Sequence, residues 1–129
     1  MKPDPALFEK LGDTLSASAL QNPGWPLKQT ALRTAVSRYY FSAFHIVLEW
    51  VIVNREYTKK GTVEDHDRIQ IKLLFVKDDA ANALDRLRKN RNTCDYNEVE
   101  PDELERRRSI AKSDLAIIKA ELDTYRPPS

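Results

Sequence analysis

Residues 27–57 read LKQTALRTAVSRYYFSAFHIVLEWVIVNREY and contain neither proline nor glycine. Apolar side chains recur in this stretch mostly at intervals of three and four residues, which is the spacing of one helix face. Aromatic and β-branched residues are dense between positions 39 and 53, so a buried strand is the competing local interpretation. A strand of this length without a turn would be unusual, and the sequence therefore predicts one long helix. Its expected apolar face comprises Leu32, Val36, Tyr39, Tyr40, Ala43, Val47, Trp50 and Val51.

Proline and glycine lie mainly outside this stretch and mark the ends of other elements. The seven prolines are at positions 3, 5, 23, 26, 101, 127 and 128. Asp4 and Pro5 predict the start of a first helix, because aspartate caps helix starts and proline suits the first helical position. The sequence QNPGWP at 21–26 predicts a turn after that helix. The expected apolar stripe of the first helix is Ala6, Leu7, Leu11, Leu15 and Leu20.

Three shorter helices are predicted after the long one. The loop TKKGTVE at 58–64 precedes a helix that begins at Glu64 or Asp65, and the acidic pair at 78–79 separates that helix from the next. The polar stretch NTCDYNEVE at 92–100 predicts a break, and Pro101 with the acids after it predicts the start of a last helix. The side chains expected to face inward are Ile69, Leu73, Leu74, Val76, Ala80, Ala83, Leu84, Leu87, Leu104, Ile110, Leu115, Ile118 and Leu122.

These elements together predict an all-α protein, an up-and-down bundle of four to five helices. A chain of 129 residues and 14.9 kDa has the size of one domain. We expect the core of that domain at about 28–122, an N-terminal helix and turn at 1–26, and a tail at 125–129.

Composition excludes several classes of protein. Hydrophobic residues make up 41% and charged residues 32% of the chain, which favours a folded soluble domain over disorder. The net charge is only +1, so any basic surface must be local. The apolar run 44–53 is far shorter than the roughly 20 residues of a membrane helix, and the N-terminal ten residues lack the apolar core of a signal peptide. With Cys94 as its one cysteine, the chain suits a reducing compartment, and we expect a cytoplasmic protein without membrane contact.

Common enzyme motifs are absent from the sequence. Three scattered glycines do not build a phosphate-binding loop, and no G-x-S-x-G motif occurs. The two histidines, His45 and His66, lack the spacing of a zinc-binding helix. The cluster 64–67 (EDHD) could contact a cation, but acidic residues at a helix start are the simpler interpretation. We expect neither a metal nor a cofactor.

A first polar constellation lies on the long predicted helix. Arg38, Ser42, His45 and Glu49 are separated by four, three and four residues, which places them on one helix face. They could contact phosphates or bases, with Arg38 as anion ligand and His45 as a titratable group. A solvated face, or a hydrogen-bonded ladder inside the bundle, is the alternative and is favoured by composition alone.

A second constellation is the basic stretch RLRKNRNTCDY at 86–96. Four of its first six residues are basic, and such a run can neutralise RNA phosphates or can equally be a solvated helix face. Arg91 and Asp95 could also simply pair with each other. Arg91 and Tyr96 would point about 140° apart on a continuous helix, so they converge only if the helix ends between them. The run 106–108 is expected on the solvent face of the last helix.

The two constellations together resemble motifs of the HEPN superfamily (higher eukaryotes and prokaryotes nucleotide-binding). Residues 37–45 (SRYYFSAFH) are similar to its R-x-Y-Y-A-x-F-H helix, and residues 91–96 (RNTCDY) to the R-x-x-A-D-Y ending of an uncharacterised prokaryotic branch. The resemblance covers about residues 28–122. It implies a helical bundle that is commonly a homodimer. Many relatives are metal-independent endoribonucleases, toxins or defence effectors, often paired with a nucleotidyltransferase.

The resemblance also implies a set of site residues. Arg91 and Asn92 match the motif arginine and the polar residue after it, but Tyr96 stands where catalytic relatives place histidine. A phenol titrates near pH 10 and an imidazole near 6.5, so Tyr96 is a poor base at neutral pH, and His45 could supply the missing imidazole. The expected catalytic residues are Arg91, Tyr96 and His45, and the expected RNA- or nucleotide-binding residues are Arg38, Arg88, Asn92 and Asp95.

Two functions remain open from the sequence. One is an RNA- or nucleotide-binding domain, and in its catalytic form an endoribonuclease that acts at a dimer cleft and leaves a 2′,3′-cyclic phosphate. The other is a non-catalytic interaction or adaptor module, for example a dimeric partner of a nucleotidyltransferase. In that case Arg91 is closed off by a carboxylate, and the abundant aromatic side chains supply both a core and an interface.

Overall fold

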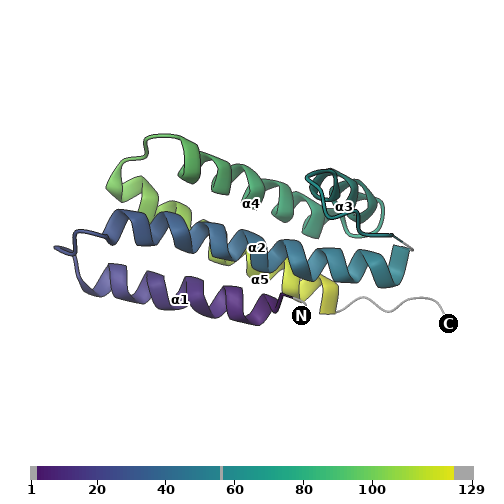
Figure 1. Ribbon diagram of the computed structural model, residues 1–129, viewed down its shortest axis with the longest axis horizontal. Helices are drawn as coiled ribbons and strands as arrows, with labels where there is room; N and C mark the ends of the chain where they lie inside the picture. Colours follow the sequence, from purple (N-terminus) through teal and green to yellow (C-terminus); the bar gives the residue numbers. More distant parts are fainter. Residues whose placement is uncertain (1–2, 56, 124–129) are drawn as a thin grey trace.

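The computed structural model describes residues 3–55 and 57–123, and in these residues the chain forms five helices and no strand. The predicted all-α class and the helical state of residues 39–53 are therefore confirmed. Figure 1 shows α1, α2, α4 and α5 side by side along an elongated bundle, whereas α3 is seen nearly end-on and lies across their direction. They are α1 (Pro5–Gln21), α2 (Lys28–Arg55), α3 (Glu64–Leu74), α4 (Asp78–Tyr96) and α5 (Pro101–Asp123).

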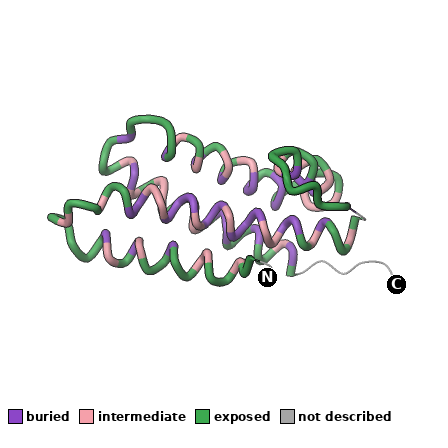
Figure 2. Tube along the Cα trace, in the orientation of Figure 1, coloured by how far each residue is buried: buried purple, intermediate pink, exposed green. Residues whose placement is uncertain are grey.

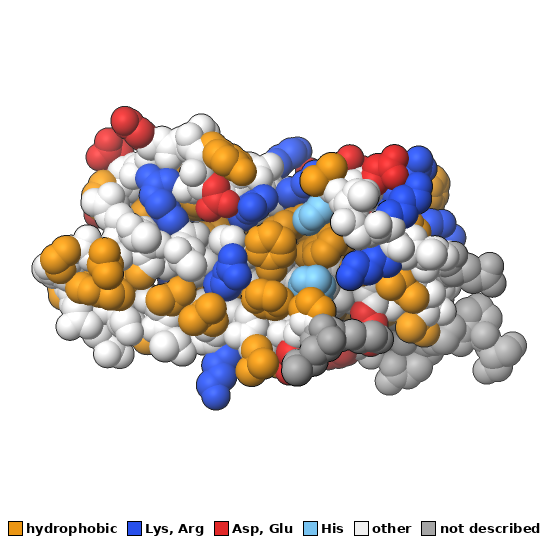
Figure 3. Space-filling model, in the orientation of Figure 1, with side chains coloured by type: hydrophobic (Ala, Val, Ile, Leu, Met, Phe, Trp, Pro, Cys, Tyr) orange, Lys and Arg blue, Asp and Glu red, His pale blue; other side chains and the backbone are white. Residues whose placement is uncertain are grey.

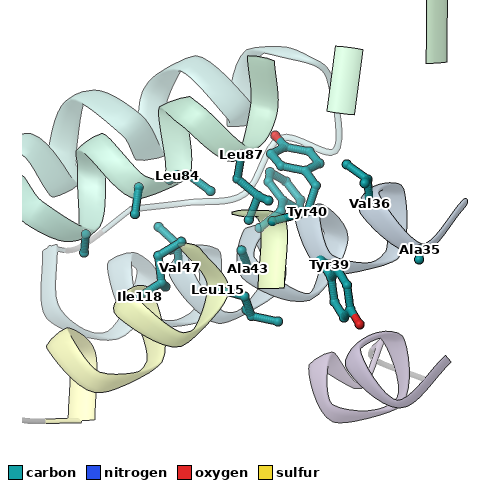
Figure 4. Packing of buried hydrophobic residues seen from close by; sticks show 14 of the residues in the cluster. Ala35, Val36, Tyr39, Tyr40, Ala43, Val47, Leu84, Leu87, Leu115 and Ile118 are labelled. Carbon is teal, nitrogen blue, oxygen red and sulfur yellow. The ribbon is translucent and has the colours of Figure 1, made fainter. Parts of the chain in front are cut away.

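Helix α2 is the central element and packs against each of the other four helices. Its buried residues follow the predicted stripe, and Figure 2 shows burial concentrated along it. In Figure 4, Tyr39 points toward α1, whereas Tyr40 lies on the side of α2 that carries Leu87 of α4. Because both tyrosine rings are almost completely buried, they fix how α1 and α4 sit on α2.

Helix starts follow the predicted capping signals. The Asp4 side chain accepts a hydrogen bond of 2.9 Å from the Ala6 amide, and Pro5 occupies the first turn of α1. Helix α5 begins at Pro101 with acids in its first turn, and α3 begins at Glu64. These boundaries confirm the predictions for these three helix starts.

The predicted apolar stripe of α1 is mostly wrong, although Leu15 packs partly buried against the core. Leu7 and Leu11 are 62% and 45% exposed, and the buried positions are instead Gly12, Ser16 and Ala19. The reason is the large Tyr39 ring of α2, since a Cβ at Gly12 would lie only 2.7 Å from its Cε1 atom. Small residues let α1 approach this ring closely, and Leu7 and Leu11 are left on the outside.

The predicted break after Arg91 is also wrong, because α4 continues through Tyr96. Arg33 of α2 donates hydrogen bonds from Nη1 to the Cys94 carbonyl and, at 2.9 Å, to the Asn97 carbonyl. These contacts satisfy carbonyl groups at the helix end that otherwise lack a partner. The tertiary cap overrides the low helix propensity of Asn92, Thr93 and Asp95.

Most inward-facing predictions hold, with exceptions at the helix ends and edges. Leu74 in the last turn of α3 and Ile110 on α5 are 49% and 44% exposed, and Val76 is only partly buried. The others form one cluster with the buried residues of α2. No helix in the described part of the chain is both long and apolar enough to cross a membrane.

Candidate functional site

Six rings from three helices form a connected aromatic group, which we call the aromatic platform. Its Tyr40 and Phe44 rings are buried, and the other four rings are partly exposed. Phe44 is its centre, with ring centroids 4.1 Å from His66 and 5.1 Å from His45. Phe8 of α1 stacks on His45 at 5.5 Å, and Tyr40 stacks on His66 at 5.6 Å. Figure 3 shows both imidazoles on one face of the molecule among hydrophobic side chains, with lysine and arginine side chains around them. The platform comprises Phe8, Tyr40, Phe41, Phe44, His45 and His66.

Arg38 lies on one edge of the platform without a carboxylate partner among the described residues. Its guanidinium carbon is 5.6 Å from the Phe8 centroid and 5.4 Å from the Phe41 centroid. Nη2 donates a weak hydrogen bond of 3.3 Å to the Ser37 hydroxyl, and the buried Nε has no partner. The positive charge is thus balanced only by ring faces, which leaves donors available to an anion.

Arg91 of α4 approaches the same Phe41 ring as Arg38 does. Its guanidinium carbon is 5.3 Å from the Phe41 centroid and 5.9 Å from that of Tyr40. Nε lies 2.8 Å from Asp95 Oδ2, so the expected pairing within α4 is confirmed, although the contact lacks hydrogen-bond geometry. The side chain keeps 24% of its surface exposed. Arg91 is therefore partly neutralised, but it is not closed off from solvent.

His66 is held between Tyr40 and Phe44. The Tyr40 hydroxyl is in hydrogen-bond contact with Nδ1 of His66, which leaves Nε2 as the nitrogen open to a ligand. Burial lowers the pKa of His66, and the charges of Arg88 and Arg91 lower it further, against the opposing effect of Asp65 and Asp67. Burial likewise raises the pKa of Tyr40 to about 12. At neutral pH the pair is thus a neutral imidazole and a neutral phenol.

His45 stacks on the opposite side of the platform from Tyr40, against Phe8 and the edge of Phe44. Burial and the nearby charge of Lys59 lower its pKa, so this imidazole is also neutral at neutral pH. It lines a small hollow of about 150 Å³ together with Lys59 and Glu49. The polar face predicted on α2 is therefore a mixed one. Ser42 donates a buried hydrogen bond of 2.8 Å to the Pro5 carbonyl, and Glu49 is exposed.

A second, more open hollow of about 500 Å³ lies beside His66. The loop between α2 and α3 forms much of its lining, and Lys59 belongs to the linings of both hollows. Lys59 has no ion-pair partner in the described ranges 3–55 and 57–123. The side chains and backbone around this second hollow are those of Phe44, Lys59, Gly61, Thr62, Val63, Asp65 and His66.

The basic stretch of α4 is largely neutralised by carboxylates. Arg86 pairs with Asp114 at 3.0 Å, and Arg88 pairs with Asp67 at 2.7 Å. Lys89 pairs with Asp85 at 2.7 Å. The interpretation as a solvated helix face therefore fits Arg86, Arg88 and Lys89. Arg88 still contributes to the site, because its charge lowers the pKa of His66.

Tyr96 does not converge with Arg91. It is the last residue of α4 and is 76% exposed. Since the helix is continuous, the two side chains point about 140° apart. Asn92 and Asp95 both contact Arg91. Nη1 of Arg91 donates a weak hydrogen bond of 3.4 Å to Asn92 Oδ1, and Asp95 forms the ion pair described above.

The acidic cluster at 64–67 is a helix start, as expected, and its members have separate partners. The Asp65 carboxylate accepts hydrogen bonds from the Tyr57 hydroxyl and from the amides of Lys60 and Gly61. Asp67 pairs with Arg88. Over the residues described, no group of three or more His, Cys, Asp or Glu side chains is arranged to hold a metal ion.

Six contributors to this surface are not among the site residues predicted from the sequence. Tyr40, Phe41 and Phe44 lie in the α2 motif segment, but aromatic side chains were expected in a core or an interface. Phe8, Lys59 and His66 come from segments that are distant in sequence from the two motifs, and local spacing carried no signal for them. In comparisons with known families, curated proteins and solved structures, nothing matches this chain.

Proposed function

We propose that the protein binds single-stranded RNA or a nucleotide at the aromatic platform, with Arg38 and Arg91 as phosphate ligands. The observation that carries this proposal is the pair of guanidinium groups over the single ring of Phe41, at 5.4 and 5.3 Å. Proteins that bind single strands combine such cations with ring faces on which bases stack. Arg88, Asn92 and Asp95 act from the rim, by charge and by orienting Arg91.

The resemblance to the HEPN superfamily supports the same function from the sequence. Its two motif segments contribute Arg38, Tyr40, Phe41, Phe44 and His45 on α2 and Arg91 on α4, and these side chains meet at the platform. By the same resemblance we propose a cytoplasmic homodimer, with a nucleotidyltransferase as a partner of a toxin–antitoxin or defence system. The mass in solution tests the dimer, and a strict monomer at working concentration excludes a shared cleft.

Metal-independent cleavage of RNA is the reaction that this chemistry suits. The ribose 2′-hydroxyl gives its proton to a neutral imidazole and attacks phosphorus, a new bond to the 2′-oxygen forms, and the bond to the 5′-oxygen breaks. The imidazolium so formed gives this proton to the leaving 5′-oxygen, and the products are a 2′,3′-cyclic phosphate and a 5′-hydroxyl end. Arg91 stabilises the negative charge that develops on phosphorus. His45 and His66 are better placed than Tyr96 for the proton transfer, because both lie in the platform.

The decisive experiment compares two arginine variants in binding to labelled single-stranded RNA. Arg38→Ala is expected to weaken binding about tenfold or more, the effect of one charge-assisted contact. Arg106→Ala is the matched control, because this arginine is exposed on α5 and its removal changes the net charge equally. Equal affinities of the two variants and the unchanged protein would exclude the proposed site and favour the adaptor alternative.

A further inference from the structure

The loop between α2 and α3 is fixed in place by one carboxylate. Asp65 accepts hydrogen bonds of 3.0 Å from the Lys60 amide at Oδ1 and of 2.9 Å from the Gly61 amide at Oδ2. The Tyr57 hydroxyl also donates to Oδ1. Gly61 has φ of 75°, a conformation that other residues rarely adopt, and this closes the turn. The backbone on both sides of Lys59 is therefore anchored before any ligand arrives.

Lys59 and Lys60 differ in how their charges are used. The ammonium group of Lys60 lies 3.1 Å from Glu64 Oε2 and is neutralised on the surface. Lys59 has no such partner within the described residues, and its charge acts on His45 and on the buried carboxylate of Asp65. Of the two neighbouring lysines, only Lys60 forms an ion pair within the part of the chain that the structure describes.

The second hollow is the better place for an anion. The first hollow contains the Glu49 side chain, whose charge repels phosphate. In the second hollow the nearest carboxylate is that of Asp65, and it is buried and occupied by its three donors. The Thr62 hydroxyl and the His66 ring also line this hollow, so hydrogen-bond donors are available beside the lysine.

A chain of contacts between rings joins this hollow to the arginine site, and within it the Tyr40 ring is buried. Arg38 lies over Phe8, Phe8 stacks on His45, and His45 borders the hollow that it shares with Lys59. On the other side, Arg91 lies over Tyr40, which stacks on His66 at the wall of the second hollow. Cations thus flank the rings of the platform on two sides.

We propose that Lys59 and Thr62 form a second phosphate subsite, and that the ligand is therefore an oligonucleotide strand that crosses the platform and not a mononucleotide. The inference rests on the proposed function and adds the class of ligand. One phosphate lies at Arg38 and Arg91, and a later phosphate of the same strand lies in the hollow beside His66. The intervening bases contact the partly exposed rings of the platform, those of Phe8, Phe41, His45 and His66.

The test measures binding of a nucleoside monophosphate and of a single-stranded RNA decamer as a function of salt concentration. Lys59→Ala is expected to weaken binding of the decamer about two- to fivefold, the effect of one exposed charged contact. It also reduces the slope of log K against log salt by about 0.7, the contribution of one phosphate on a single strand. Binding of the monophosphate stays unchanged.

Lys60→Ala is the matched control, since it removes the same charge one residue away. We expect it to leave both ligands unaffected, and its thermal midpoint and that of Lys59→Ala should equal the original one. Equal effects of the two lysine variants on the decamer would overturn the second subsite. Loss of decamer binding in Arg38→Ala together with no effect of Lys59→Ala would retain the proposed function and reject this inference. No effect of Arg38→Ala on either ligand would reject the proposed function itself.

Discussion

Tyr40 determines which nitrogen of His66 faces the surface. Its hydroxyl contacts Nδ1, so Nε2 is free for a ligand, and the stacked Phe44 ring holds the imidazole plane. Among the described residues no carboxylate is bound to this ring, although the charges of Asp65 and Asp67 act on it. In the tautomer in which Nδ1 donates its hydrogen to the Tyr40 hydroxyl, Nε2 can take up a proton from a bound hydroxyl group.

The burial of His66 makes stability sensitive to mild acid. Its pKa in the folded protein lies below the ordinary value of about 6.5, so the unfolded chain binds the proton first as the pH falls. The free energy of unfolding therefore decreases below about pH 6.5 and is unaffected above it. We expect His66→Gln to reduce this loss, as measured by urea unfolding at pH 7.5 and 5.5. An identical loss of unfolding free energy in His66→Gln would contradict the assignment of this loss to His66. The variant keeps His45, so the loss that remains reports the contribution of His45.

Gly12 is a position where adding one methyl group is expected to destabilise the protein. A Cβ there would lie 2.7 Å from Tyr39 Cε1, and the ring cannot retreat because its hydroxyl is bound to Asp13 at 2.7 Å. Gly12→Ala should lower the free energy of unfolding by about 1–2 kcal/mol, because overpacking exceeds the gain in helix propensity. Gly24→Ala is the control, since open space surrounds Gly24. A thermal midpoint at or above the original in Gly12→Ala would refute the close packing.

At the scale of elements, the end of α4 depends on a side chain from α2. Arg33 satisfies the Cys94 and Asn97 carbonyls, and the sequence from Asn92 to Asp95 has little helix propensity of its own. Arg33→Ala should therefore shorten α4 and cost about 1–3 kcal/mol. Amide hydrogen exchange checks this, with faster exchange expected at residues 93–97 and no change at the start of the helix. Arg106→Ala, which removes an exposed arginine, should leave the exchange as it is.

The same dependence explains what could be predicted from the sequence. Helix starts were accessible because their signals are local, as at Asp4, Pro5 and Pro101. The end of α4 and the buried face of α1 were not, because Arg33 and Tyr39 decide them from another helix. For the site, Arg38, His45 and Arg91 could be named in advance from the motifs, whereas Tyr96, predicted beside Arg91, points away from it. Phe8, Lys59 and His66 could not, since only the packing of α1, α3 and the loop brings them to the platform.

At the scale of the whole molecule, an ion-pair network joins the first helix to the last. Lys112 Nζ lies 2.6 Å from Glu9 Oε2 and 2.8 Å from Asp13 Oδ1, and Lys119 Nζ lies 2.8 Å from Glu9 Oε1. Burial alone would raise the pKa of Glu9 and Asp13, but the lysines outweigh it and hold both pKa values below the ordinary ones. The network ties α1 and α5 together across the sequence.

A second acid transition follows from this network. Since the carboxyl pKa values are lower in the folded state, their stabilising effect is complete above the ordinary values of about 4 and is lost as the pH falls through the folded values. Stability should therefore decrease in two steps, one below pH 6.5 from the histidines and one below about 4. Lys112→Met is expected to diminish the second step only. Thermal unfolding between pH 7 and 3 measures both steps. If Lys112→Met changed only the step below pH 6.5, the assignment of the second step to Glu9 and Asp13 would be refuted.

The start of α1 lies beside the surface where we place the ligand. Pro3 borders the small hollow together with His45, and the Pro5 carbonyl is bound to Ser42 in the middle of α2. Because Pro3 lies there, a polyhistidine tag joined only two residues earlier would bring extra imidazoles and charge near the proposed ligand site. Purification handles for assays on this protein therefore belong elsewhere, or must be cleaved before the first measurement.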